Sequence, residues 1–117
     1  MLGIERKLVG IRMSDIVIHN GVVYLSGKVP KNLTGDIQEQ TKDVLSTIEV
    51  LLEQAGSSKA HLLRVEIWLS SMSNFAAMNE VWDSWVVPEQ TPTRATVEAK
   101  LAKPEYLIEI MATAALK

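Results

Sequence analysis

The sequence contains no cysteine, so a disulfide framework, a thiolate nucleophile and a zinc–thiolate site are all excluded. The same absence is compatible with a reducing compartment. No run of apolar residues approaches the ~20 that a membrane-spanning helix needs. The chain begins Met-Leu-Gly-Ile-Glu-Arg-Lys, which lacks the long apolar core of a signal peptide. We therefore expect a cytoplasmic protein that does not associate with a membrane.

An excess of charge of either sign is also missing. The 12 Lys and Arg residues against 14 Asp and Glu residues give a formal net charge of -2, with a pI of about 5.7. Such a chain has no broad cationic field to hold a nucleic-acid backbone, so nucleic acid is not an expected partner. His19 and His61 lack metal-ligand spacing with an acidic partner, and no glycine-rich phosphate loop is present. We expect neither a bound metal nor a cofactor.

The sequence does contain enough apolar residues for a core. Its 117 residues are 47% hydrophobic, which favours one folded domain over residues 1–117. Periodicity predicts strands over residues 4–9, 15–19 and 22–29, a helix over 37–55, a strand over 62–69, a helix over 73–86, and strands over 94–101 and 106–115. This order, β-β-β-α-β-α-β-β, predicts an α+β fold.

Short-range signals mark the ends of several predicted elements. The Asn-Gly dipeptide at residues 20–21 tolerates the positive φ angles of a two-residue hairpin turn. Asp36 and Glu39 resemble a capping pair at the start of the first helix, and Gly56 is suited to its end. Ser73 is the expected cap of the second helix.

The strand over residues 62–69 has two contrasting faces. Val65, Ile67 and Leu69 alternate with a second set of side chains that includes Trp68. Two amphipathic helices can cover one face of the predicted sheet, and no further element remains for the face that carries Trp68. Because a bulky uncovered face marks an interaction surface, we expect the chain to associate with other copies of itself.

Glu109 interrupts an otherwise apolar strand, where Leu107 and Met111 share its face. A carboxylate among apolar side chains is a candidate for exchanging protons with water or a substrate. The alternatives are a solvent-exposed edge position and an ion pair with a lysine.

Two further polar residues break the local pattern. Asn79 lies between Phe75 and Trp82 in the apolar stripe of the second helix, so its amide either binds backbone groups or faces a pocket. Arg94 shares the polar face of its strand with Thr96. That face is either solvated, as exposed charge usually is, or it presents a planar guanidinium that grips a carboxylate through two hydrogen bonds.

Four short motifs, in order along the chain, resemble those of the RidA/YjgF/YoaB family. Residues 26–30 (Ser-Gly-Lys-Val-Pro) resemble its strand-ending Ser-Gly-Gln-(Ile/Val)-Pro segment, and residues 75–82 (Phe-Ala-Ala-Met-Asn-Glu-Val-Trp) resemble its second helix. Residues 92–98 (Pro-Thr-Arg-Ala-Thr-Val-Glu) are similar to its Pro-x-Arg-x-x-Val motif, and residues 108–110 (Ile-Glu-Ile) resemble its closing strand. The resemblance covers nearly the whole chain and is greatest for the YoaB branch.

The resemblance implies a chorismate-mutase-like fold, related to the ferredoxin-like arrangement, in which two helices cover one face of a six-stranded mixed sheet. It also implies a homotrimer with clefts between subunits that hydrolyses 2-aminoacrylate and other 2-imino acids to 2-keto acids and ammonia. By the same resemblance, Arg94 binds the substrate carboxylate and Glu109 positions the attacking water. Gly27, Asn79 and Thr96 would line the cleft. The implied partners are a small 2-imino or 2-keto carboxylate and other copies of the chain.

The chain departs from the family pattern at two places. Thr96 stands where the archetype often has cysteine, and residues 13–15 (Met-Ser-Asp) stand where it brings in an aromatic side chain. Two other functions remain open. One is a non-catalytic module that binds a small carboxylate at Arg94, and the other is an RNA-acting or translation-inhibiting protein. Retention of both Arg94 and Glu109 favours catalysis, and the acidic pI disfavours the RNA function.

Overall fold

The computed structural model describes residues 3–117, so the predicted domain 1–117 begins two residues outside the described range. Its strands are β1 (Glu5–Val9), β2 (Ser14–His19), β3 (Val22–Leu25), β4 (Leu62–Leu69), β5 (Thr93–Glu98) and β6 (Ile108–Ala115). Its α-helices are α1 (Ile37–Gln54) and α2 (Phe75–Trp85), with short 3₁₀ helices η1 (Lys59–His61) and η2 (Met72–Asn74). Within residues 3–117, no helix has both the length and the apolar character to cross a bilayer.

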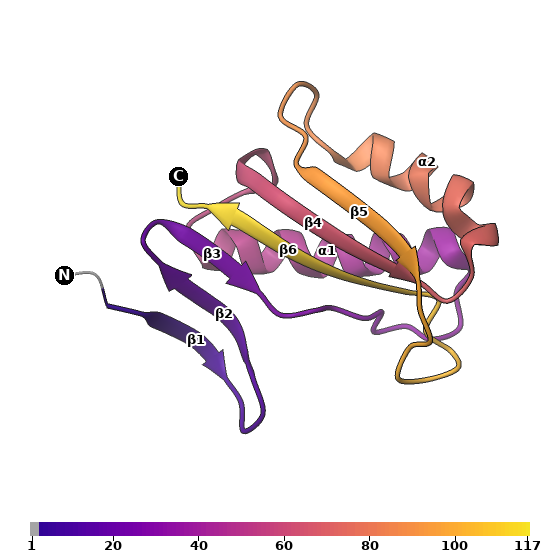
Figure 1. Ribbon diagram of the computed structural model, residues 1–117, viewed down its shortest axis with the longest axis horizontal. Helices are drawn as coiled ribbons and strands as arrows, with labels where there is room; N and C mark the ends of the chain where they lie inside the picture. Colours follow the sequence, from indigo (N-terminus) through magenta and orange to yellow (C-terminus); the bar gives the residue numbers. More distant parts are fainter. Residues whose placement is uncertain (1–2) are drawn as a thin grey trace.

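The six strands form one mixed sheet in the order β1-β2-β3-β6-β4-β5. Neighbouring strands are antiparallel except β4 and β5, which are parallel and are connected through α2. The helix α1 packs against β6, β3 and α2, and Figure 1 shows α1 behind the sheet with α2 beside the β5 edge. The prediction of an α+β fold with two helices on one face of a six-stranded mixed sheet is confirmed.

Most of the predicted element ends have the expected local structure. Asn20 and Gly21 have φ angles of 52° and 76° in the turn between β2 and β3. The Asp36 side chain accepts a hydrogen bond of 2.9 Å from the backbone N–H of Glu39 at the start of α1, and Gly56 has a φ of 85° just after its end. These signals predict correctly because each depends on only a few neighbouring residues.

The predicted cap of the second helix is wrong. The helix α2 starts at Phe75, and Asn74 before it makes no side-chain capping bond. Ser73 instead lies in η2, where its N–H donates to the Ser71 hydroxyl over 3.2 Å. The extra 3₁₀ turn moves the start of α2 by two residues, which a capping pattern alone does not reveal.

The predicted strand over residues 22–29 is interrupted. The strand β3 ends at Leu25, and the chain returns to β6 only at a single bridge between Lys28 and Ile110. From Tyr24 to Lys28 the chain advances four residues, whereas β6 opposite advances three, from Thr113 to Ile110. One extra residue is therefore inserted here, as in a β-bulge.

The core lies between the helix-bearing face of the sheet and the two helices. Val65, Ile67 and Leu69 of β4 are buried there, as predicted from their alternation. On the opposite face, here called the open face, Trp68 is half-buried and no other element of residues 3–117 covers it. Tyr24 and Val97 on this face are 47% and 51% exposed. The predicted uncovered face is thus present in the single chain.

Candidate functional site

Arg94 projects from β5 toward α2. Its strand register places it opposite Val65, which is buried on the helix-bearing face. The Arg94 Nη1 donates a hydrogen bond of 2.8 Å to the Asn79 Oδ1 on α2. The guanidinium carbon lies 5.8 Å from the Phe75 ring centroid and 5.2 Å from that of Trp82. The amide and the two aromatic rings together fix the guanidinium at the edge of the helix.

The electrostatic environment of Arg94 leaves room for an anion. Burial lowers the pKa of Arg94, and the nearby carboxylate of Asp83 raises it in part. None of the ion pairs among residues 3–117 includes Arg94. The guanidinium is therefore partly desolvated without a direct counter-ion, and a planar carboxylate is the group that matches its remaining donors.

Thr96 and Glu98 follow Arg94 on the same face of β5. The Glu98 carboxylate accepts a hydrogen bond of 2.9 Å from the Met72 N–H, which ties β5 to the segment before α2. The Thr96 hydroxyl oxygen is buried and has no hydrogen-bond partner in the described part of the chain. Arg94, Asn79 and Thr96, with the two aromatic rings, form what we call the Arg94 half-site.

A second group of candidate residues lies where β6 passes the bulge after β3. The carboxyl group of Glu109 rests against Gly27, since a Cβ added at Gly27 would stand 3.4 Å from the Glu109 Cδ and nearer still to its Oε2. The buried Gln40 fixes the segment before β6 by donating to the Glu105 carbonyl over 2.9 Å and accepting from the Leu107 N–H over 2.8 Å. We call Gly27 and Glu109 the Glu109 half-site.

The two half-sites lie on opposite faces of the sheet. Arg94 is opposite Val65 on the helix-bearing face, whereas Glu109 is opposite Trp68 on the open face. The structure thus brings Arg94 together with Asn79 and, separately, Gly27 together with Glu109, but it does not bring Arg94 and Glu109 together within one chain. Any site that uses both groups needs two copies.

Sequence reasoning left several neighbours of these residues unassigned to a site. Phe75 and Trp82 were expected only as core residues of their helix, because an apolar stripe does not reveal which strand residue lies against it. Asp15 and Lys28, which contact each other beside Gly27, gave no signal because their contact depends on the bulge. Among residues 3–117, no group of three or more His, Asp or Glu side chains is arranged to hold a metal ion.

Comparisons with known proteins agree on one family. The family model described as Endoribonuclease L-PSP matches residues 8–116. The RutC family protein YoaB of Escherichia coli is 47% identical over 105 residues, covering 90% of this chain and 91% of its own. A RutC family protein of Haemophilus influenzae is 43% identical over 92% of this chain and 94% of its own.

A solved structure gives the same result in three dimensions. A member of the YjgF protein family from Neisseria meningitidis superposes with a TM-score of 0.96 at 45% identity, covering 99% of this chain and 97% of its own. With the motif order, the fold and these matches in agreement, the chain belongs to the RidA/YjgF/YoaB family, also called the RutC family.

Proposed function

We propose that this protein hydrolyses 2-imino acids, including the imine tautomer of 2-aminoacrylate, to 2-keto acids and ammonia. The observation that carries the proposal is the half-buried Arg94 guanidinium, which Asn79 holds but no described carboxylate pairs with. A planar cation of this kind binds a carboxylate through two parallel hydrogen bonds. Every 2-imino acid carries such a carboxylate beside its reacting carbon.

The proposed active site lies between copies of the chain, which we propose assemble as a homotrimer. Because Arg94 and Glu109 lie on opposite faces of one sheet, the Glu109 that acts with a given Arg94 comes from a neighbouring subunit. The open face supports this arrangement, since Trp68, Tyr24 and Val97 have apolar surface that no other element of residues 3–117 covers.

The proposed chemistry needs little beyond positioning. Arg94 fixes the carboxylate, so the imine carbon lies beside a water held by Glu109 of the neighbouring subunit. The water oxygen attacks that carbon, Glu109 accepts a proton from the water, and the C=N bond becomes a C–N single bond. The nitrogen takes up a proton from solvent to give a neutral carbinolamine. Glu109 then returns its proton to that nitrogen, the C–N bond breaks as the hydroxyl loses its proton and becomes the C=O group, and ammonia and the 2-keto acid are released. Holding the reactants together supplies much of the acceleration, because the imine carbon is already electrophilic.

The test is a coupled assay in which a dehydratase generates 2-aminoacrylate or an amino-acid oxidase generates imino acids. We expect wild-type protein to speed the release of ammonia and 2-keto acid above the uncatalysed rate. Arg94→Ala should lower kcat/KM roughly 10- to 150-fold, which corresponds to the loss of a charge-assisted hydrogen-bond pair. Arg94→Lys keeps the charge without the fork and should recover little of the activity. Wild-type protein that accelerates no imino acid would contradict the proposal.

A second candidate function is a carboxylate-binding module without catalysis. It is favoured by one observation, namely that Arg94, Asn79, Phe75 and Trp82 come together within a single chain and without Glu109. The same assay separates the two functions. Binding of pyruvate, measured by calorimetry, without acceleration of any imino acid would favour the module, whereas loss of turnover in Glu109→Gln with pyruvate binding retained would favour the enzyme.

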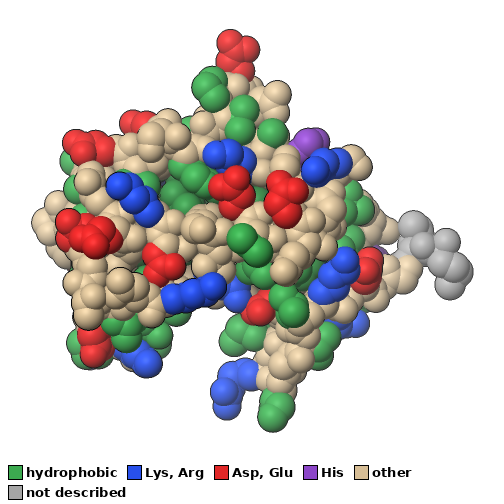
Figure 2. All heavy atoms as spheres, turned by 180° about the vertical axis from the view of Figure 1, so that it is seen from behind, with side chains coloured by type: hydrophobic (Ala, Val, Ile, Leu, Met, Phe, Trp, Pro, Cys, Tyr) green, Lys and Arg blue, Asp and Glu red, His purple; other side chains and the backbone are tan. Residues whose placement is uncertain are grey.

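The name of the matching family model raises RNA cleavage as a further possibility for this family. Figure 2 shows the helix-bearing face, where Lys and Arg side chains are interspersed with Asp and Glu rather than gathered in a stripe. The net charge of -2 adds no general attraction for phosphates. These features support a small carboxylate over RNA as the ligand that we propose.

A further inference from the structure

The bulge after β3 determines where Gly27 lies. Without the inserted residue, the β3 register would continue and the chain between Tyr24 and Lys28 would keep its pairing with β6. With it, Gly27 comes to rest against the carboxyl group of Glu109. A bulge of this kind is held by the contacts on either side of it, since its own residue has no partner in the ladder.

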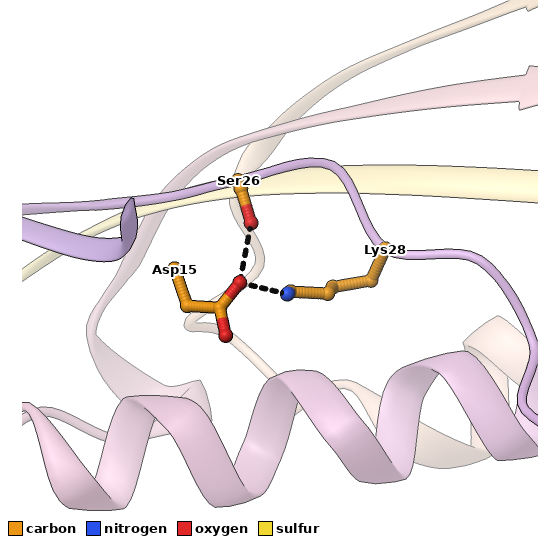
Figure 3. A network of polar contacts seen from close by, with 3 residues as sticks. All are labelled: Asp15, Ser26 and Lys28. Atoms are coloured by element: carbon orange, nitrogen blue, oxygen red, sulfur yellow. Dashed lines mark hydrogen bonds and ion pairs between the residues drawn. The ribbon is translucent and has the colours of Figure 1, made fainter. Parts of the chain in front are cut away.

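Asp15 makes contacts on both sides of Gly27. Its Oδ1 accepts hydrogen bonds from the Ser26 hydroxyl over 3.2 Å and from the Lys28 ammonium group over 2.5 Å. Figure 3 shows the two donors converging on this one oxygen from either side of the turn. The Asp15 carbonyl also accepts from the Ser26 N–H over 3.1 Å. The residue before Gly27 and the residue after it are thus both tied to β2.

Lys28 connects this network directly to the strand that carries Glu109. Its N–H donates to the Ile110 carbonyl over 2.8 Å, and its carbonyl accepts from the Ile110 N–H over 3.0 Å. The Lys28 ammonium group, which pairs with Asp15, is mostly buried, with 17% of its side chain exposed. A partly buried, charge-assisted contact holds its geometry better than an exposed ion pair.

We propose that Asp15 and Lys28 are positioning residues, whose ion pair holds the 26–28 turn so that Gly27 fixes the orientation of the Glu109 carboxylate. This inference rests on the proposed function, because it assigns the pair to the group that we propose positions the attacking water. Neither residue touches the substrate. Their effect reaches the reaction through Ser26, Gly27 and the paired backbone of Ile110.

The alternative is that the ion pair only links β2 to the turn and stabilises the fold, without affecting the reaction selectively. A positioning role predicts a different result, since a small displacement of a catalytic group lowers the rate of the chemical step more than it weakens substrate binding. Arg94 lies on the opposite face of the sheet from Glu109. Changes in KM should therefore reflect the contact between Arg94 and the substrate carboxylate, and changes in kcat should reflect the position of Glu109. The two roles are separable by kinetics.

The experiment uses three variants at the ion pair and one control variant. Asp15→Asn keeps the shape but removes the charge, and Lys28→Met keeps the stem but removes the donor. We expect each to lower kcat about 10- to 100-fold with KM changed less than about threefold. The double variant Asp15→Lys with Lys28→Asp restores an ion pair with reversed polarity. It should recover at least about a third of the decrease in log kcat. Glu53→Gln removes a partner of Lys117 at the far end of α1 and should leave kcat unchanged.

A readout that needs no turnover separates this inference from the proposed function. The ¹³C resonance of the Glu109 carboxyl carbon at pH 7 should move in Asp15→Asn and Lys28→Met and stay in place in Glu53→Gln. If wild-type protein has no imine hydrolase activity but the resonance moves, the positioning inference stands and the proposed function fails. If both single variants fold with wild-type kcat, or the resonance does not move, the positioning inference is wrong.

Discussion

Arg94 is a single side chain whose surroundings favour the binding of an anion. Its pKa is lowered by burial, yet the ordinary value for arginine is so high that the group stays charged at physiological pH. Asn79 satisfies one donor, and the rings of Phe75 and Trp82 contribute only their electron-rich faces. A partly desolvated cation without a direct counter-ion carries an energetic cost, and a carboxylate bound at this position would offset part of it.

Thr96 offers a test at the same scale. Its buried hydroxyl has no partner in the described chain, so Thr96→Val replaces an unsatisfied polar atom by a methyl group of similar shape. We expect the free energy of unfolding to rise by about 1 kcal/mol, measured by urea denaturation at one fixed protein concentration. The matched control is Thr41→Val, because the buried Thr41 hydroxyl donates to the Ile37 carbonyl over 2.7 Å. That variant should lose stability by about the same amount. Equal losses in both variants would mean that the Thr96 hydroxyl has a partner in the assembled protein.

At the scale of elements, periodicity and turn chemistry predict those features of a helix or strand that depend only on neighbouring residues. The Asn-Gly turn at residues 20–21 and the cap at Asp36 have the expected geometry because each depends on a few adjacent residues. The interruption of the strand after Leu25 was not predictable, since it depends on pairing with β6, from Tyr24↔Thr113 to Lys28↔Ile110, between residues more than 80 positions apart in the chain.

The candidate site, too, was predictable from the sequence only in part. Arg94 and Asn79 were both selected from the sequence, but their hydrogen bond across the β5–α2 gap was not, because a strand pattern does not say which face a helix covers. The more common interpretation of the Arg94 face as solvated holds for Glu98, which is exposed, but not for Arg94 and Thr96, which are half-buried, with Arg94 against α2. The placement of Arg94 and Glu109 on opposite faces also follows only from the register of three strands.

The link between β2 and the 26–28 turn predicts a pH dependence of stability. The hydrogen bond and charge of Lys28 lower the pKa of Asp15 in the folded state, with a smaller contribution from Ser26, while burial opposes them. A carboxyl group with a lowered folded pKa adds stability above its unfolded pKa of about 4, and that stability is lost as the pH falls further. Asp15→Asn should therefore be less stable than wild type at pH 7 by less than about 1 kcal/mol, because the pair is partly solvent-screened.

That difference should shrink as the pH is lowered from about 5 to 3, since wild-type Asp15 then becomes neutral as well. Urea denaturation at a series of pH values measures it, and Glu53→Gln, which removes an exposed ion pair, serves as the reference for non-specific charge effects. A difference between Asp15→Asn and wild type that stays constant down to pH 3 would show that the carboxylate form of Asp15 contributes nothing.

At the scale of the whole molecule, the main feature is a sheet of which helices cover only one face. The two helices cover the face that contains Val65 and Ile67, and the other face presents Trp68, Tyr24 and Val97. The same open face carries Glu109, whereas the Arg94 half-site lies on the helix-bearing face, at the β5 edge of the sheet. Association through the open face would cover apolar surface, and the proposed function needs Glu109 of one copy to meet Arg94 of another, so assembly and activity should be lost together.

Val97→Asp tests this link, because it places a charge on the open face, opposite Trp68 at the β5 edge of the sheet, without entering the core. We expect wild-type protein to have a mass near 39 kDa, about three times the 13.0 kDa chain, by light scattering after gel filtration. The variant should shift toward 13.0 kDa with its circular dichroism unchanged and its imine hydrolysis abolished, since burying an unpaired carboxylate costs several kcal/mol per interface. Val50→Asp is the matched control, because Val50 is 54% exposed on α1, on the other side of the sheet. A Val97→Asp protein that separates into single chains but keeps its activity would mean that one chain holds a complete site, and the division of Arg94 and Glu109 between subunits would have to be abandoned.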